Sequence, residues 1–353
     1  MHKTNRNIKT LTVSLLFGLL ATSCGFDDGD HPSTADDGAV RVAFRMSFAE
    51  DATRAANDGW DDYDPTDPGS AYENAINADE LQVCVCDNDG RIIANVDNIV
   101  VTNTAADSQT ASYAITGTWN DAAEHIGEAK KIMVFANCGS IPVDAGNVEQ
   151  LAFERSATAN FIPMWGVCSI ASPLQMGKQN NIGTIDLLRS MAKLKVRLED
   201  GMLERGYALG DISLSNYNER GYCLPKTYGS VDRTSLIRFD GSLNALASWK
   251  NNIQFTGNTT ESLTLYIPEY DVRNAAEERK PTVNVLLTRN GKEEGTYKVR
   301  FCHYVDGEPQ DGSEFDIQRN HFYDYTVGKN SDLLNISLHV REWNKRQQDL
   351  IIM

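Results

Sequence analysis

The stretch Val40-Arg-Val-Ala-Phe-Arg-Met-Ser-Phe48 indicates the fold more clearly than any other part of this chain. Its large apolar residues alternate with Arg, Ala and Ser without a break, at Val40, Val42, Phe44, Met46 and Phe48. Because successive side chains of a β-strand point to opposite faces, this pattern places all of them on one face. The segment is therefore predicted to be a strand with one face buried.

A second strand of the same kind lies near the C-terminus. Its apolar residues are Leu334, Ile336, Leu338 and Val340, and its alternating partners are Asn335, Ser337, His339 and Arg341. Trp343 and the apolar end Leu350-Ile-Ile-Met353 follow it. The two ends of the chain thus carry strands with interchangeable patterns.

Period-two patterns bounded by turn residues also fill most of the chain between these strands. Residues 81–86 and 91–96 flank Asp87-Asn-Asp-Gly90, whose Asp-Gly pair suits a tight hairpin turn. Further strands are predicted at residues 111–118, 131–137, 161–169, 192–198, 211–216, 263–267, 282–287, 295–304 and 321–327. Short helices are predicted at residues 121–128 and 244–249. The fold class is therefore all-β with a few short helices.

The number of strands predicts more than one domain. Roughly fourteen strands exceed the seven to nine of a single β-sandwich. A new alternating strand begins just after Leu188, in Met191-Ala-Lys-Leu-Lys-Val-Arg-Leu198. The chain is predicted to fold into two tandem β-sandwich domains, residues 39–188 and 189–353.

The charge composition of the chain limits which classes of molecule it can bind. The chain has 353 residues, with 33 Lys and Arg against 49 Asp and Glu, for a formal net charge of −16. Binding to nucleic acid or to an anionic membrane surface requires clustered basic residues that this sequence lacks. The sequence therefore predicts no nucleic-acid partner.

The N-terminal residues read as an export signal. A basic start is followed by the apolar run Leu11-Thr-Val-Ser-Leu-Leu-Phe-Gly-Leu-Leu20. The sequence Leu20-Ala-Thr-Ser-Cys-Gly25 resembles the lipobox of bacterial lipoproteins, which makes Cys24 the predicted lipidation site. Residues 1–23 are the predicted signal peptide, residues 24–38 an acidic tether, and the lipid on Cys24 the only expected contact with a membrane.

No motif for catalysis or cofactor binding stands out. The sequence lacks the metalloprotease, serine-hydrolase and P-loop signatures, and its six histidines are scattered. Cys84 and Cys86 are not matched by a second close cysteine pair, as a zinc site would require. An acidic run from Asp62 ends with Glu73 at the twelfth position, but Asp67 stands at the sixth, where an EF-hand needs Gly. We expect no enzyme activity, no cofactor and no metal.

A protease-sensitive position follows the first strand. Arg54 lies in a polar connector that leads into the Pro- and Gly-rich stretch around Asp64-Pro-Thr-Asp-Pro-Gly69, where a trypsin-like protease could cut. Cleavage there would release residues 40–48 and leave an apolar groove for the C-terminal strand of another copy to fill. The alternative is that both terminal strands are ordinary members of their own sandwiches.

Several segments together resemble the fimbrillin superfamily of Bacteroidetes, the FimA/Mfa type of surface pilus subunits. They are the lipobox at Cys24, Ala52-Thr-Arg-Ala55, Ile162-Pro-Met-Trp-Gly166, Leu188-Arg-Ser-Met-Ala-Lys-Leu-Lys-Val196, Leu265-Tyr-Ile-Pro-Glu269, Arg319-Asn-His-Phe-Tyr323 and Leu338-His-Val-Arg-Glu-Trp343. The order and spacing of these segments carry the resemblance, which extends over nearly the whole chain.

The resemblance implies a fold, a processing route and a location. The domains would be transthyretin-like sandwiches in a lipoprotein of the outer membrane. An Arg-specific protease would cut after Arg54, so that the mature chain starts at Ala55 without its first strand. Residues 334–353 would then join copies of the chain, or related subunits, head to tail in a surface fimbrium that supports adhesion to a host or bacterial ligand. The alternative is an uncut, lipid-anchored pilus anchor or a surface protein that binds a ligand or glycan.

Overall fold

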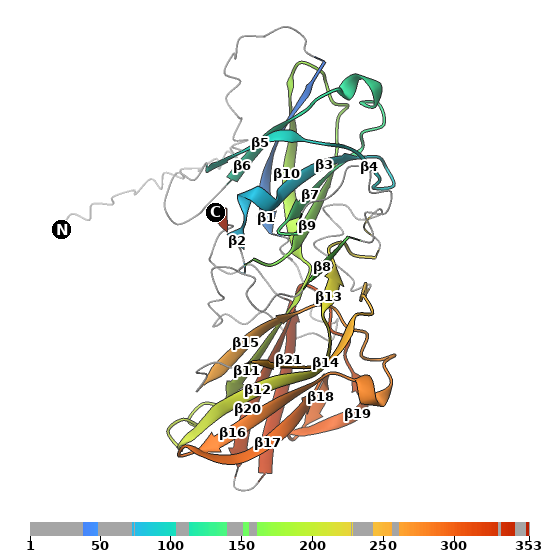
Figure 1. Ribbon diagram of the computed structural model, residues 1–353. Helices are drawn as coiled ribbons and strands as arrows, with labels where there is room; N and C mark the ends of the chain where they lie inside the picture. The colour runs from blue at the N-terminus through green and yellow to red at the C-terminus, as the bar shows by residue number, and fades with distance from the viewer. Residues whose placement is uncertain are drawn as a thin grey trace, which may run out of the picture. The chain divides into compact units, whose positions relative to one another are not determined.

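The computed structural model describes residues 38–48, 73, 75–103, 113–139, 151–154, 161–226, 228, 243–255, 261–330, 333–342 and 351–352. These residues form strands joined by turns and loops (Figure 1), which confirms the all-β fold class. Within these ranges, no helix has the length and apolar character needed to cross a membrane. Cys24, Arg54 and Ala55 lie outside the described residues.

The first large sheet has eight strands and is rolled on itself. In spatial order they are β4 (Ile92–Asn95), β3 (Leu81–Cys86), β7 (Lys131–Ala136), β9 (Met164–Ser169), β10 (Gln179–Arg189), β1 (Val40–Phe48), β6 (Tyr113–Trp119) and β5 (Asp97–Asn103). Its edge strands β4 and β5 are separated in sequence by Val96 alone, so the two edges of the sheet must come close together. Apolar side chains from the two halves of this rolled sheet pack into one core between them. This is the two-layer arrangement of a sandwich.

The hairpin between β3 and β4 forms as the Asp-Gly signal predicts. The side chain of Asp87 accepts hydrogen bonds from the backbone N–H groups of Asp89 and Arg91, at 2.9 and 2.8 Å. Gly90 adopts a φ of +84°, a conformation that side chains with a Cβ rarely tolerate. The turn is therefore set by residues within the hairpin itself.

Two four-stranded sheets form a sandwich in the C-terminal part of the chain. One contains β15 (Ser262–Ile267), β11 (Ala192–Leu198), β20 (His321–Asn330) and β21 (Leu333–Glu342), in that order. The other contains β14 (Trp249–Phe255), β12 (Tyr207–Asn218), β16 (Thr282–Arg289) and β17 (Lys292–Arg300). Leu194 of the first sheet and Val285 of the second belong to the same buried cluster, so the two sheets share a core.

Three small strand pairs complete the described structure. They are β18 (Cys302–Val305) with β19 (Glu308–Glu314), β8 (Ala152–Glu154) with β13 (Arg220–Tyr222), and β2 (Ala75–Ile76) with β22 (Ile351–Ile352). Between Arg189 and Ala192 the chain leaves the eight-stranded sheet and enters the first four-stranded one.

The predicted helices are the main local error. Residues 244–248 form neither helix nor strand, and Trp249 begins β14. The side chain of Asn244 donates to the carbonyl of Leu224, and Ser248 pairs with Asn218 and Arg220. Residues 121–128 contain only the 3-10 turn η3 (Ala122–Glu124), which Asp121 enters with a φ of +55°. Two further 3-10 turns in the described part of the chain are η2 (Ala78–Glu80) and η6 (Glu277–Arg279).

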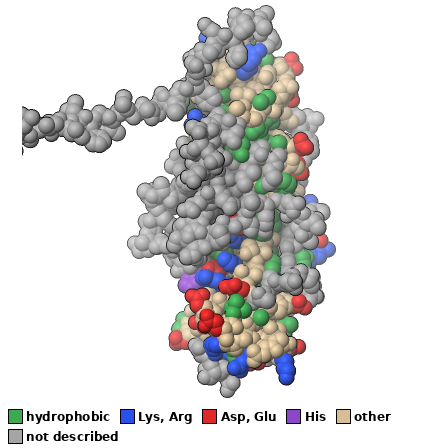
Figure 2. Space-filling view, turned by 90° about the vertical axis from the view of Figure 1, so that its left-hand side faces the viewer, with side chains coloured by type: hydrophobic (Ala, Val, Ile, Leu, Met, Phe, Trp, Pro, Cys, Tyr) green, Lys and Arg blue, Asp and Glu red, His purple; other side chains and the backbone are tan. Residues whose placement is uncertain are grey.

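Charges are mixed over the described surface. On the face shown in Figure 2, acidic and basic side chains lie close together instead of gathering into one large area of a single sign. Ion pairs such as Arg300–Asp311, at 2.8 Å, and Lys329–Glu294, at 2.6 Å, are examples of this mixing. The charges of Arg300 and Lys329 are therefore compensated locally.

Candidate functional site: the terminal strands

Strand β1 occupies an interior position in its sheet. It pairs in parallel with β10 and antiparallel with β6, and Phe44 lies between Gly183 and Ile115. The parallel register breaks between Ala43 and Phe44, where the partner strand contributes an extra residue. Removing β1 would therefore expose backbone groups on two neighbouring strands at once.

The apolar face of β1 is part of the core. Val40, Val42, Phe44 and Met46 are all buried, with Phe44 fully inaccessible to solvent. Ala43, on the opposite face, is also buried, so the strand is covered on both sides at its middle. Phe48 is the last residue of the strand, and its side chain lies outside the described part.

Strand β21 occupies an edge position. Among the described strands it pairs only with β20, in antiparallel register from Leu333 to Glu342. Ile336 and Val340 are buried in the home core, while Leu338 is partly buried against it. The side chain of Leu334 is outside the described part, although its backbone continues the strand. The C-terminal segment thus begins as a strand of its own sheet.

The last described strand, β22, pairs with the short strand β2 that precedes β3. Ile351 and Ile352 pair in parallel with Ala75 and Ile76, both of which are fully buried. The side-chain amide of Asn137 donates to the carbonyl of Ala75 at 2.9 Å and holds this short strand in place. Two short segments that are far apart in the sequence therefore meet in one small sheet.

A buried ionic cluster surrounds Glu73. The ammonium of Lys193 lies 2.9 Å from its carboxylate, and the hydroxyl of Tyr266 donates to the same oxygen at 2.6 Å. The guanidinium of Arg189 donates to the backbone carbonyl of Glu73 at 3.0 Å, and burial lowers the pKa of Arg189 to about 10. Glu73, the twelfth position of the calcium-loop pattern, therefore forms an ion pair with Lys193.

A second buried pair joins Arg319 to Glu269. The guanidinium donates to one carboxylate oxygen from two nitrogens, at 3.0 and 2.6 Å, and to the carbonyls of Cys223 and Tyr222. The side chains of both partners are almost fully buried, at 1% and 2% exposure. This pair fastens the start of β20 to the end of β15 and to the β13 segment.

Sequence reasoning missed both buried pairs. A signal was present, because Lys193, Glu269 and Arg319 are charged residues inside or beside apolar strand patterns. Charged residues are seldom fully buried unless they are paired, so such positions point to partners elsewhere in the chain. The sequence does not indicate which partners these are.

Most cysteines of the described residues are buried. The six cysteines of the described residues are free thiols, and five of them are buried. Burial raises the pKa of the Cys84 thiol to about 12, so this group stays protonated near neutral pH. In the described ranges, no three His, Cys, Asp or Glu side chains are grouped so that they could hold a metal ion.

One family of proteins matches the chain. The model of the fimbrillin-A associated anchor proteins Mfa1 and Mfa2 matches residues 152–349, more than half of the sequence. A comparison with curated protein sequences found no match.

Several solved structures of low sequence identity align with most of the chain. The tip fimbrial protein Mfa3 of Porphyromonas gingivalis, truncated at its C-terminus, aligns over 86% of this chain and 100% of its own, with a TM-score of 0.50 and 16% identity. A fimbrial assembly protein of Parabacteroides distasonis covers 85% and 95%, with a TM-score of 0.49 and 11% identity. The fimbrial anchor protein Mfa2 of P. gingivalis covers 86% and 98%, with a TM-score of 0.35 and 10% identity. The likeness to Mfa3 supports the fold alone.

Proposed function

The chain belongs to the family of fimbrillin-A associated anchor proteins Mfa1 and Mfa2, and from this premise we propose a structural, non-catalytic subunit of cell-surface fimbriae. In this proposal the chain is exported as a lipoprotein on Cys24, cut after Arg54 by an Arg-specific protease, and assembled by donor-strand exchange. The fimbrium would support adhesion to host or bacterial surfaces.

The interior position of β1 is the observation that carries the proposal. An edge strand could be lost without opening a sheet, but β1 separates β10 from β6. Its loss would leave a groove lined by apolar side chains and bordered by two rows of unpaired backbone groups. Such a groove accepts an extended strand from another chain.

The apolar face of β1 indicates how strongly a donor would be held. Burying a side chain such as Val, Phe or Met contributes roughly 1.5–3 kcal/mol. Four residues of β1 are buried in this way. A donated strand with a matching pattern would therefore form a durable joint between subunits.

The C-terminal segment is the proposed donor, residues 334–353. Strand β21 pairs with one neighbour among the described strands, so its release disrupts one ladder and not two. Leu334, Ile336, Leu338 and Val340 would take the places that Val40, Val42, Phe44 and Met46 leave. The contact between β22 and β2 would open in the same step.

Two domains are proposed, at residues 39–188 and 189–353. The change of sheet between Arg189 and Ala192 supports this boundary. So does the second buried cluster, whose members all lie between Ala192 and Val340, although the first cluster also takes in Met191, Cys223, Leu224 and Phe322.

A second candidate is a pilus anchor, because the matching family is described as one of anchor proteins. An anchor would keep its lipid and its first strand and would hold the base of the fimbrium. The two candidates differ at Arg54, which only the polymerising subunit needs.

Replacing Arg54 by alanine is expected to abolish assembly. Without the cut, β1 stays in its groove and no donor strand can enter, so the native cell should yield monomers in place of the high-mass ladders of the unmodified protein. The measurement is gel electrophoresis of surface fractions without boiling, together with N-terminal sequencing and intact mass.

Arg91→Ala, an exposed arginine in the β3–β4 turn, is the matched control and should assemble normally. If the chain without substitutions starts at Ala55 and carries no lipid, the result supports the subunit proposal. Ladders that persist in Arg54→Ala, or a lipidated Cys24 on an uncut monomer, would contradict it and favour the anchor.

Replacing Leu338 by aspartate is expected to reduce polymer by about tenfold or more, because a charge on the donated face would be buried in the groove. Leu338 is only partly buried at home, so the variant subunit should still fold. The matched control is Ser337→Asp, on the opposite face of β21 and also partly exposed. Equal polymer yields from the two variants would count against β21 as the donor.

A further inference from the structure

A cavity of about 420 Å³ lies at the end of the C-terminal sandwich, beside the start of β14. Its walls include Trp249, Tyr270, Arg279 and several alanines, and the carboxylate residues Asp271 and Glu278. Trp249 is 40% exposed, an unusual position for the largest apolar side chain. Assembly through β1 and β21 does not use this cavity.

The exposed indole is held in a fixed orientation. The indole N–H of Trp249 donates to the side-chain oxygen of Asn216 at 3.1 Å. The side-chain amide of Asn216 in turn donates to the carbonyls of Glu278 and Lys280, both at 3.0 Å. Asn216 has a φ of +59°, a backbone conformation that asparagine tolerates better than most residues. The hydrogen bonds of Asn216 thus hold the Trp249 side chain at the surface.

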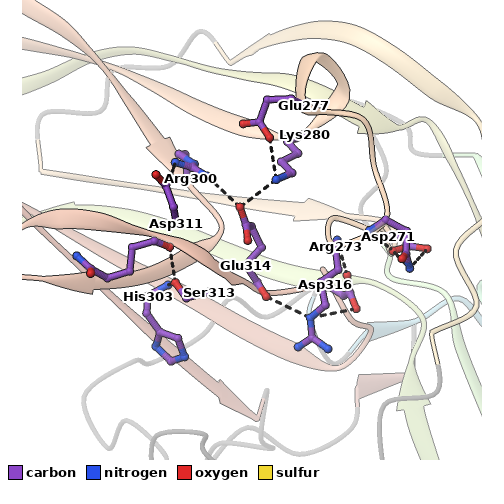
Figure 3. Close-up of polar contacts among 12 residues, drawn as sticks. Asp271, Arg273, Glu277, Lys280, Arg300, His303, Asp311, Ser313, Glu314 and Asp316 are labelled. Carbon is purple, nitrogen blue, oxygen red and sulfur yellow. Dashed lines mark hydrogen bonds and ion pairs between the residues drawn. The ribbon is translucent and has the colours of Figure 1, made fainter.

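Residues 271–280, which supply several of the other lining residues, are also held in place, and Figure 3 shows some of the contacts that hold them. The ammonium of Lys280 lies 2.9 Å from the Glu314 carboxylate and 2.8 Å from that of Glu277. The backbone N–H of Arg273 donates to the side chain of Asp316 at 3.0 Å. These contacts tie residues 271–280 to the β19 end of the sandwich. The cavity therefore exists before any ligand arrives, which lowers the entropic cost of binding.

Polar groups surround the aromatic wall. The guanidinium of Arg279 stacks on the indole, 5.1 Å from the ring centroid, and supplies hydrogen-bond donors. Asp271 and Glu278 supply carboxylate acceptors on the same cavity. The hydroxyl of Tyr270 is already used, because it donates to the carbonyl of Arg279 at 2.7 Å.

From this arrangement we propose that the cavity is a saccharide-binding site. A pyranose ring has an apolar C–H face, which packs on an indole, and a rim of hydroxyls that both donate and accept hydrogen bonds. The part of the Trp249 indole that stays exposed beside Arg279, together with the alanine methyl groups, matches the apolar face of the sugar. The carboxylates and Arg279 match its rim of hydroxyls. The two carboxylates disfavour polyanionic ligands such as nucleic acid.

The test is saturation-transfer NMR on the purified full-length chain with four separate probes. The probes are the methyl glycosides of galactose, mannose and N-acetylglucosamine, and N-acetylneuraminic acid. At least one of them is expected to show saturation transfer, and Trp249→Ala is expected to weaken its binding by about tenfold, the loss of one aromatic contact. Ala247→Leu, at an exposed position lining the cavity, should weaken binding by filling the space.

Val305→Ala is the matched control, since Val305 is an exposed apolar residue that does not line the cavity, and it should bind like the unmodified chain. Thermal unfolding of each variant shows whether it is folded. If Trp249→Ala does not fold, the binding measurement on Ala247→Leu decides the test. A signal from none of the four probes, or one that neither cavity variant weakens, overturns the proposal. The NMR and unfolding measurements both use the monomeric chain, so their outcome does not depend on whether the chain assembles into fimbriae.

Discussion

Replacing Phe44 by alanine is expected to destabilise the uncut chain by about 3–5 kcal/mol and to leave the assembled fimbria as stable as before. Phe44 is fully buried in the middle of β1, between β10 and β6, so its truncation leaves a cavity in the core. In the proposed assembly, cleavage after Arg54 would discard the whole strand, and a donor strand would take its place. The substitution would then have no remaining effect.

The measurement is denaturant unfolding of two samples, the purified uncut chain and the fimbriae that the same strain assembles. Val100→Ala is the matched control, because Val100 is an apolar strand residue with 55% exposure, and its change should stay within about 0.5 kcal/mol. The milder Phe44→Leu follows if Phe44→Ala does not accumulate. Fimbriae destabilised as much as the uncut chain would mean that β1 is retained, which is the behaviour of an anchor.

Replacing Glu269 by alanine is expected to lower the free energy of unfolding by about 3–5 kcal/mol. The loss of the carboxylate would leave the Arg319 guanidinium buried without its counter-charge, at 1% side-chain exposure. The two backbone carbonyls that also accept from Arg319 compensate only part of this loss. Thermal or denaturant unfolding of the uncut chain is the measurement.

Glu219→Ala is the control for this substitution. Glu219 pairs with Lys250 at 3.1 Å, but both side chains are about half exposed, so its loss should change stability by less than about 1 kcal/mol. The double variant Glu269→Leu with Arg319→Met removes both charges and should recover much of the lost stability. Equal effects of Glu269→Ala and Glu219→Ala would show that the buried pair contributes no more than a surface pair.

Local patterns accounted for most of the strands. The period of two at residues 40–48 and 192–198 is visible in the sequence because it depends only on which side of a strand each residue faces. The β3–β4 hairpin was equally predictable from the sequence, because Asp87 and Gly90 define the turn within a few residues. Such features need no knowledge of distant partners.

Strands whose stability comes from their neighbours were harder to predict. Strand β19 has the polar sequence Glu308-Pro-Gln-Asp-Gly-Ser-Glu314 and forms because it pairs with β18. Strand β14 begins at a residue assigned to a helix, because Trp249 is oriented by Asn216 on the adjacent strand. In both cases the tertiary context outweighed the local pattern.

By itself, the sequence determined that this protein is all-β and that both ends carry half-apolar strands, because the side-chain alternation of a strand is a local property. Only the tertiary structure decided that β1 is an interior strand while β21 is an edge strand, because strand order depends on pairings between residues more than a hundred positions apart. The same holds for the partners of Lys193 and Arg319, and for the cavity beside Trp249. Buried charges and cavities arise from side chains that meet only when the whole chain is folded.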